Sequence, residues 1–302
     1  MPKSGGDAPR AFRLALRRAA PTIARPLPWV GCHDPWAVLV SEVMLQQTPT
    51  TRVAGPWARF LERFPTPKSC ADAPLADVLR LWIGLGYPRR AKFLHDAARV
   101  IRDEFGGEVP SDGVALRALP GVGEYTASAV LTFAFGADVV VLDTNVGRVL
   151  ARAVQNRTLE RVDATAVARS LLPPGEGAAF NQAMMDLGAQ FCRARPRCES
   201  CPVALACRWR REGGSDPARR SAGVSRAQGR FEGSNRQLRG LVLRALVASG
   251  RSTRALGHEI GALELGRLEG VLDGLQRDGL IEREGCRVRL AGSDSKARRA
   301  LA

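Results

Sequence analysis

A glycine-rich turn between two helical stretches constrains this 302-residue chain more than any other feature. Leu116 and Leu119 end an apolar helical run, Gly121 and Gly123 predict a tight turn, and a second helix is expected over 124–135. Glycine lets a ligand approach the backbone closely, and the new helix start offers unpaired N–H groups to an anion. The pattern therefore predicts that this turn binds a phosphate through its backbone N–H groups. The spacing alone favours a plain helix–helix turn at least as strongly.

A carboxylate follows this turn. Asp143 comes after the β-branched run Val139–Val141 and directly before a helix expected to begin at Asn145. The simplest interpretation is a helix cap, which is a common role for Asp. The same position brings a carboxylate near the backbone that would hold the anion.

A second carboxyl group lies in apolar surroundings. Glu42 belongs to a predicted helix over 37–46, between Val40 and the run Val43–Leu45. Loss of solvation there raises the pKa of a carboxyl group and lets it stay protonated as a general acid near neutral pH. A salt-bridged glutamate at the rim of a pocket is the alternative, and spacing alone favours it.

Four of the seven cysteines form a cluster in the sequence, with gaps of five, two and five residues. This spacing predicts a metal site, and an odd cysteine count fits a reducing cytosol better than a disulfide framework. Zinc and an iron–sulfur cluster both accept four thiolates. The clustered residues are Cys192, Cys198, Cys201 and Cys207, and the other three are interpreted as ordinary small residues.

The charge of the chain predicts an anionic partner. Its net charge is +15 and its isoelectric point is about 10.7, for which nucleic acid is the first expectation, although a membrane surface or a ribosome also fits. No apolar run is long enough to span a bilayer, and the N-terminus lacks the apolar core of a signal peptide, so we expect a cytoplasmic protein.

Helical periodicity dominates and strand signals are almost absent, so the expected class is all-α. Residues 1–10 are expected to be disordered, and the alternation of apolar residues and arginines after them predicts a basic amphipathic helix. Beyond the helices already named, the predicted ranges are 50–63, 75–82, 88–104, 112–118, 145–154, 163–171 and 177–191.

The C-terminal part differs in composition. Residues 208–230 are rich in Arg, Gly, Ser and Pro, which is typical of a linker. Three predicted helices and a β-hairpin around Gly285 then match a winged-helix pattern, with Arg283, Arg287 and Arg289 on the wing. The predicted helices are 237–249, 253–260 and 265–278, and the strands are 280–282 and 287–290. DNA binding and plain packing are nearly equal alternatives, and the charge favours DNA.

From about Leu27 to Cys207 these motifs resemble the endonuclease III superfamily of helix-hairpin-helix DNA glycosylases. In family order the chain carries the segments 41–48, 84–87 and 180–188 and the four cysteines. Within the superfamily they are most similar to the adenine DNA glycosylases of the MutY family, in the short actinobacterial form without a Nudix-like C-terminal domain.

The resemblance implies a two-lobed architecture. Residues 8–31 with 139–211 would form the iron–sulfur cluster lobe, and 32–138 a six-helix barrel lobe with the helix-hairpin-helix. A basic linker over 212–234 and a winged-helix-like domain over 235–292 would follow. The four cysteines would hold a [4Fe–4S] cluster, although the family usually has six residues in the first gap.

The implied reaction is removal of adenine mispaired with 8-oxoguanine or guanine in base excision repair. Glu42 matches the catalytic acid that protonates the leaving base, Asp143 the carboxylate that stabilises positive charge on the sugar, and Asn145 its support. Tyr125 stands where relatives that also cut the backbone carry a lysine. Because tyrosine cannot form a Schiff base, the implied enzyme is monofunctional and uses water as the nucleophile.

The resemblance also implies DNA contacts. Gln46, Gln47 and Tyr87 resemble a wedge that fills the gap left by a flipped base, with Gln47 and Tyr87 beside the orphan guanine. Trp29 and Leu45 correspond to pocket and substrate contacts. The remaining implied contacts are Asp186, an acid near the adenine, and the phosphate grip of Gly121 and Gly123. Departures from the family pattern are Val30, Pro88 and Thr144, which replace a common arginine, tyrosine and glycine.

Two other functions stay open. A mismatch thymine or uracil glycosylase also carries tyrosine in the hairpin, but the pair Gln46 and Gln47 favours the adenine enzyme. A non-catalytic iron–sulfur DNA-binding regulator would not need both Glu42 and Asp143. The expected partner is double-stranded DNA with mismatched or oxidised base pairs, bound by a monomer in the bacterial nucleoid, with no membrane partner.

Overall fold

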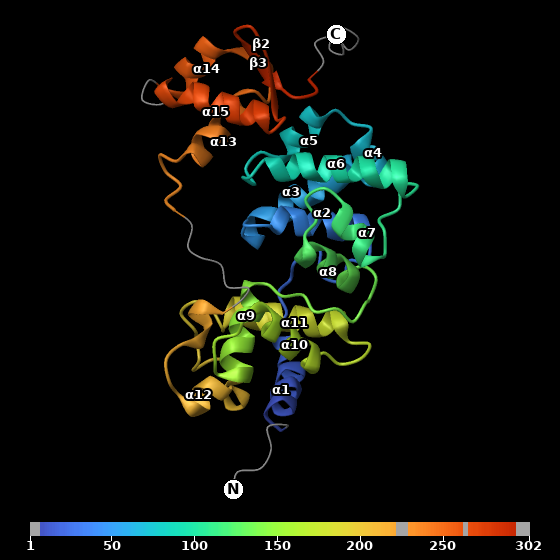
Figure 1. The fold of residues 1–302 in the computed structure, drawn as a ribbon, viewed down its shortest axis with the longest axis vertical. Helices are drawn as coiled ribbons and strands as arrows, with labels where there is room; N and C mark the ends of the chain where they lie inside the picture. Colours follow the sequence, from blue (N-terminus) through green and yellow to red (C-terminus); the bar gives the residue numbers. More distant parts are fainter. Residues whose placement is uncertain (1–6, 222–228, 262–264, 294–302) are drawn as a thin grey trace. The chain divides into compact units, whose positions relative to one another are not determined.

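The computed structural model describes residues 7–221, 229–261 and 265–293, and these residues form two compact units (Figure 1). One unit combines Met1–His33 with Gly123–Ala227, and the other combines Asp34–Val122 with Gln228–Ala302. The chain passes from one unit to the other between Val122 and Gly123, within the predicted hairpin. Helices make up most of both units, which confirms the all-α class. No described helix is long and apolar enough to cross a membrane.

The first unit is built on α1 (Asp7–Ile23), whose apolar face is buried. Phe12 and Leu16 of this helix share a core with Leu150 and Met184. Residues 7–10, predicted to be disordered, belong to α1 instead, because a proline such as Pro9 is tolerated in the first turn of a helix. Residues 1–6 lie outside the described part. The other helices of this unit are α8 (Glu124–Phe133), α9 (Thr144–Val149), α10 (Arg161–Leu171), α11 (Gly177–Gln190) and α12 (Arg208–Glu212).

Residues predicted as one helix over 145–154 form two elements. A π-helical turn, η1 (Leu150–Gln155), continues directly from α9 and ends at Asn156 in the left-handed conformation. Such π-turns occur often at functional sites. The short 3₁₀ turns η2 (Ala204–Ala206) and η3 (Pro217–Arg220) follow later in the chain.

The second unit begins with a barrel of helices. Its elements are α2 (Pro35–Leu45), α3 (Thr50–Arg63), α4 (Pro67–Ala71), α5 (Leu75–Trp82), α6 (Arg89–Glu104) and α7 (Gly113–Ala118). Phe60 lies at their centre, edge-on to Phe64 and Trp82. The short helix α4 was not predicted; a capping box between Thr66 and Ser69 stabilises it.

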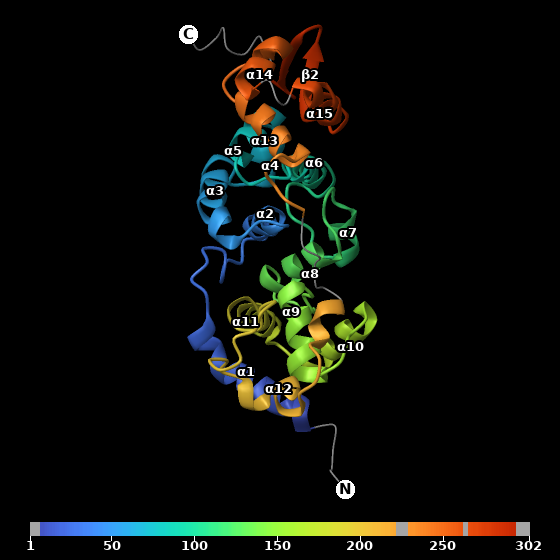
Figure 2. The same ribbon diagram turned by 90° about the vertical axis from the view of Figure 1, so that its left-hand side faces the viewer.

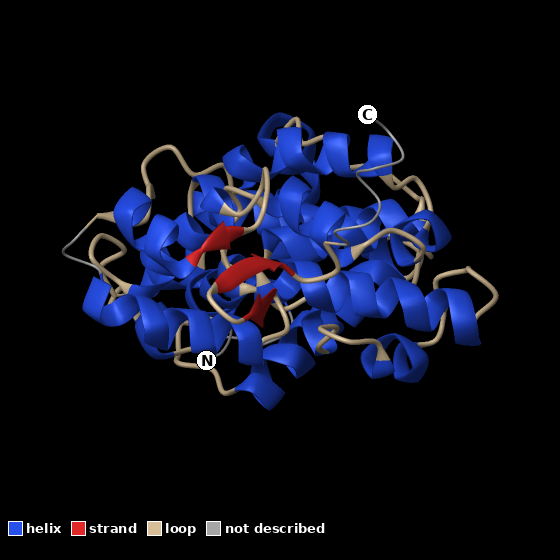
Figure 3. Cartoon of the chain, turned by 90° about the horizontal axis from the view of Figure 1, so that it is seen from above, coloured by secondary structure: helices blue, strands red, loops and turns tan. Residues whose placement is uncertain are grey.

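The C-terminal domain belongs to the same unit and has a winged-helix-like fold (Figures 1 and 3). Its antiparallel sheet has the order β1-β3-β2 and pairs Glu282 with Arg289. The elements are α13 (Asn235–Ala245), β1 (Arg251–Ser252), α14 (Thr253–Ile260), α15 (Leu265–Arg277), β2 (Ile281–Glu284) and β3 (Arg287–Leu290).

This domain packs against the barrel near α5 and α6 (Figures 1 and 2). Arg80 of α5 donates a hydrogen bond to the carbonyl of Val247 at 3.0 Å. Asp278 accepts from Arg239 within the domain and lies 3.5 Å from the Arg89 side chain of the barrel. The tail is therefore docked on the lobe that contains Glu42.

Candidate functional site

Helix α2 holds Glu42 in an apolar environment. Asp34 caps its start by accepting hydrogen bonds from the backbone N–H groups of Trp36 and Ala37. Nearly the whole helix is buried, and Glu42 is only 5% exposed. A buried carboxyl among apolar residues is the environment that favours a neutral, proton-donating acid.

The end of α2 is held by Arg90, a residue that the sequence analysis did not single out. Its guanidinium is 7% exposed and donates to the carbonyls of Val43, Met44 and Gln46 at 2.6–2.9 Å. It also donates to the carbonyls of residues 85–87 at 2.8–3.3 Å and to the Thr48 hydroxyl at 3.0 Å. Burial lowers the pKa of Arg90 to about 10. Arg90 thus ties the end of α2 to the 84–87 loop.

Two predicted wedge residues stand on the segments that Arg90 ties together. Gln47 has φ +56° and Tyr87 has φ +46°, left-handed conformations that cost a non-glycine residue roughly 1–3 kcal/mol. Gln47 is exposed and Tyr87 is half-buried. Such strain persists where the surrounding structure imposes it, and Arg90 supplies that constraint.

The glycine turn differs at its two glycines. Gly121 has φ +76°, and an added Cβ would lie 2.7 Å from Cβ of Phe93, so no other residue fits. Gly123 has an extended conformation and lies at the start of α8, where no side chain caps the first N–H groups. A helix start of this kind is where backbone N–H groups can meet an anion.

Asp143 is the N-cap of α9, the role that its spacing predicted. Its Oδ1 accepts from the N–H of Val146 and its Oδ2 from the Asn145 amide, both at 2.7 Å. Burial raises the pKa of the Asp143 carboxyl, while these two hydrogen bonds and the charge of Arg148 act in the opposite direction.

The Asp143 contacts continue toward the cysteines. Arg148 donates to Asn145 Oδ1 at 2.6 Å and to the carbonyl of Cys192 at 2.7 Å. Gly188 permits this arrangement, because an added Cβ would lie 2.6 Å from Cβ of Asn145. A chain of hydrogen bonds therefore joins the carboxylate to the backbone of the first cysteine.

The four cysteines line one cavity. Buried Arg152 donates to Cys192 Sγ at 3.6 Å, pairs with Asp216 at 2.6 Å and lies 5.4 Å from the ring centroid of Trp209. Burial raises the pKa of Cys192, whereas Arg152 favours its thiolate form. Among the described side chains, no three or more Cys, His, Asp or Glu are arranged to hold a single ion. Arg193, Arg195 and Arg197 are exposed on the loop after Cys192.

The contacts of Arg152 also explain part of the predicted linker. Residues 208–221 are ordered rather than irregular, because α12 packs against η1 and Asp216 is held by Arg152. Residues 222–228 lie outside the described part of the chain.

The other predicted contacts are distributed over both units. In the first, Trp29 is buried, Val30 is 39% exposed, and Tyr125 packs on the core. Asp186 is 2% exposed, and its carboxylate accepts from Arg25 at 2.5 Å and from Gln182 at 3.0 Å. In the second, Leu45 and Gln46 are half-buried at the end of α2.

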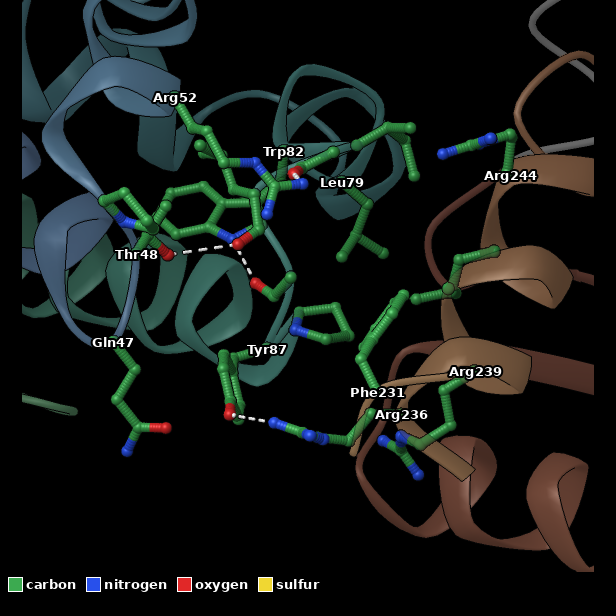
Figure 4. A pocket seen from close by; sticks show the side chains of 18 of the residues that line it. Gln47, Thr48, Arg52, Leu79, Trp82, Tyr87, Phe231, Arg236, Arg239 and Arg244 are labelled. Atoms are coloured by element: carbon green, nitrogen blue, oxygen red, sulfur yellow. Dashed lines mark hydrogen bonds between the residues drawn. The ribbon is translucent and has the colours of Figure 1, made fainter. Parts of the chain in front are cut away.

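Two of the three wing arginines, Arg283 and Arg289, pair with acids of their own domain. Arg283 pairs with Glu269 at 2.7 Å and with Asp273 at 2.8 Å, and Arg289 pairs with Glu282 at 2.8 Å. The face of α13 instead presents Arg236, Arg239 and Arg244 to a cavity that also contains Gln47 and Tyr87 (Figure 4). On the wing, Arg283 and Arg289 are thus engaged by acids of their own domain while Arg287 is exposed; on α13, Arg239 pairs with Asp278 and Arg236 donates to Tyr87, while Arg244 is exposed.

Comparisons with known proteins identify the family of this chain. The family model described as HhH-GPD superfamily base excision DNA repair protein matches residues 40–174. The adenine DNA glycosylase of Mycolicibacterium smegmatis is 44% identical over 285 residues, which cover 91% of this chain and 94% of that protein. The adenine DNA glycosylase of Mycobacterium tuberculosis is 44% identical over 269 residues, 86% of each chain.

Two solved structures are similar in fold. A thermostable thymine-DNA glycosylase has a TM-score of 0.64 and 27% identity, covering 69% of this chain and 99% of its own. An endonuclease III in a non-covalent complex with DNA has a TM-score of 0.57 and 26% identity, covering 67% and 96%. The family match and the helical fold agree with the identity to the mycobacterial relatives, which extends over most of the chain. The chain therefore belongs to the adenine DNA glycosylase family of the HhH-GPD superfamily of base excision DNA repair proteins.

Proposed function

We propose that this protein hydrolyses the N-glycosidic bond of adenine paired with 8-oxoguanine or guanine in double-stranded DNA. The observation that supports it best is the contrast between two carboxyl groups. Glu42 is buried on an apolar helix, whereas Asp143, whose pKa is also raised by burial, accepts two hydrogen bonds that favour its ionised form. Environments that separate two carboxyl groups in this way are typical of an acid and a charge-stabilising partner.

In this mechanism Glu42 donates a proton to a ring nitrogen of adenine. The C–N bond breaks with its electron pair going to the base, and Asp143 stabilises the positive charge that develops on the sugar. Water then adds to the sugar carbon and loses a proton, which balances the proton that Glu42 gave to the base, and an abasic site results. Asn145 holds the Asp143 carboxylate through its 2.7 Å hydrogen bond. Tyr125 offers no amine, so no Schiff base forms between the enzyme and the sugar and the DNA backbone stays intact.

The four cysteines fit a [4Fe–4S] cluster, because all of them line one cavity and Arg152 and Arg148 lie beside Cys192. When bound, the cluster supplies a covalent cross-link of the 192–207 loop. Arg193, Arg195 and Arg197 on that loop would then be held for contact with phosphates. Stoichiometric zinc without sulfide in freshly prepared protein would contradict this assignment.

The proposed DNA contacts follow the predicted residues. Gly121 and Gly123 offer backbone N–H groups to a phosphate, and Gln46, Gln47 and Tyr87 fill the gap beside the flipped base. Because Arg25 and Gln182 occupy the Asp186 carboxylate, we propose that Asp186 acts on the substrate through Arg25. Trp29 and Leu45 stay proposed substrate contacts. The division into a cluster lobe (8–31 with 139–211), a barrel lobe (32–138), a linker (212–234) and a tail domain (235–292) is likewise a proposal.

A single-turnover assay tests the reaction with four labelled duplexes: A:8-oxoguanine, A:G, G:T and G:U. We expect adenine release from the first two, with strand breaks only after alkali treatment. Borohydride should trap no enzyme on the DNA. Release of thymine or uracil instead would favour the mismatch thymine/uracil glycosylase, which the likeness to a thymine-DNA glycosylase keeps as the second candidate.

A further inference from the structure

A cavity of about 560 Å³ lies between the barrel and the tail domain, within the second unit (Figure 4). Its barrel wall includes Gln47, Arg52 and Tyr87, and its tail wall includes Phe231 and Arg244. Pockets of roughly 300–1,000 Å³ hold small ligands, so the space suffices for one nucleotide.

The lining has the chemistry of a nucleotide site. It contains four arginines, Arg52, Arg236, Arg239 and Arg244, and no acid among the described lining residues. It also contains three aromatic side chains, of which Phe231 is 57% exposed although it is large and apolar. Arg239 pairs with Asp278, Arg52 donates to the carbonyl of Gly84 and Arg236 donates to the Tyr87 hydroxyl, whereas Arg244 is exposed on α13. Because aromatic rings stack on bases and a guanidinium binds phosphate, Phe231 together with Arg244 fits a nucleotide better than an apolar ligand or a bare anion.

The tail also positions the aromatic wall of the barrel. Arg236 of α13 donates to the Tyr87 hydroxyl at 2.8 Å, and its guanidinium carbon lies 5.9 Å from the centroid of the Phe231 ring. Tyr87 and Gln47, both in left-handed conformations, line this cavity. Glu42 is not among its described lining residues, so the cavity is distinct from the place where a base would receive a proton.

We propose that this cavity binds one nucleotide of the DNA duplex, the one opposite the adenine, and that the tail domain completes it. Phe231 stacks on the purine base, Arg244 binds its phosphate, and Arg236 positions Tyr87 from α13. This inference rests on the proposed function, because it requires a duplex with adenine opposite a purine. The tail thereby contributes to the choice of the opposite base.

Binding is measured with duplexes in which an uncleavable 2′-fluoro adenine analogue lies opposite 8-oxoguanine, guanine or an abasic analogue. Phe231→Ala should weaken binding to the two purine duplexes by roughly five- to hundredfold, the range found for loss of one stacked base. Binding to the abasic duplex should not change. Arg244→Ala should weaken binding to all three duplexes and lower the log–log salt slope by about 0.9.

Arg277→Ala is the matched control, because Arg277 is exposed on α15 and does not line the cavity. It should leave the preference for a purine over the abasic analogue unchanged. Phe231 is largely exposed, so its loss should not unfold the domain, and a thermal melt verifies this. Equal weakening of all three duplexes by Phe231→Ala, or no weakening, overturns the inference. Failure of the wild-type protein to release adenine from both A:8-oxoguanine and A:G DNA overturns the proposed function instead. The two failures are distinguishable, because one is read from base release and the other from binding to uncleavable duplexes.

Discussion

Replacement of Arg90 by Met should destabilise the barrel strongly, because the substitution leaves a group of buried carbonyls without their donor. The guanidinium makes seven hydrogen bonds, six of them to backbone carbonyls. At about 1.5–3 kcal/mol for each hydrogen bond to a charged group, the sum would exceed the stability of a typical domain, so the bonds cannot be additive. Loss of one partner from a buried ionic network costs about 3–5 kcal/mol, and we expect that value here.

Urea unfolding of Arg90→Met and Arg90→Lys measures this cost. In a separate thermal melt, each kcal/mol lost lowers the melting temperature by about 2–4 °C, so the methionine variant should melt about 10 °C below the wild type. Lysine has three donors, so it should recover only part of the loss. Arg99→Met, on the exposed face of the same helix, should change the free energy of unfolding by less than about 0.5 kcal/mol.

The same variants test whether Arg90 positions the wedge. The barrel that remains folded at low temperature should bind undamaged duplex almost normally, but should lose its preference for mismatched duplex as residues 46–47 and 87 move apart. An Arg90→Met protein whose free energy of unfolding lies within about 1 kcal/mol of wild type would refute the reasoning, because the carbonyls would then have found other donors.

The remaining predictions concern the reaction and the cysteine cluster. Glu42→Gln and Asp143→Asn should each keep DNA binding while lowering the single-turnover rate of adenine release by roughly 10²–10⁴, and near-normal rates would contradict the assigned roles. Burial raises the pKa of Asp143 and its ionised form is required, so activity should fall on the acidic side at a higher pH than for an ordinary aspartate. Asn145→Ala removes a hydrogen bond that favours the ionised form, so it should move this acidic limit further upward, and a pH–rate profile that does not move would exclude the role of Asn145. Anaerobically purified protein should contain iron and sulfide and be yellow-brown, and removal of the metal should loosen the loop between Cys192 and Cys207, seen as faster proteolysis there.

Local sequence determined the helices and the order of the motifs. The ranges 50–63 and 75–82 agree with α3 and α5 because apolar periodicity and flanking prolines specify them without help from distant residues. Helix caps also depend only on neighbouring residues: the Asp143 carboxylate accepts a hydrogen bond from the backbone N–H of Val146, three residues later. The sequence predicted a tight turn at Gly121, and the structure adds that Phe93 leaves no room for a side chain at this position.

Distant contacts decided what the sequence could not show. In a chain of 45 lysines and arginines, Arg90 and Arg152 look like surface cations, yet both are buried because carbonyls or an acid far away in the sequence surround them. The wing arginines were expected to face DNA, but acids of α15 and β2 pair with Arg283 and Arg289. Charge and periodicity describe a residue and its neighbours in sequence, whereas the partner of a long side chain depends on which segments fold against it. For the same reason only the tertiary structure placed Phe231 and Arg236 beside Tyr87.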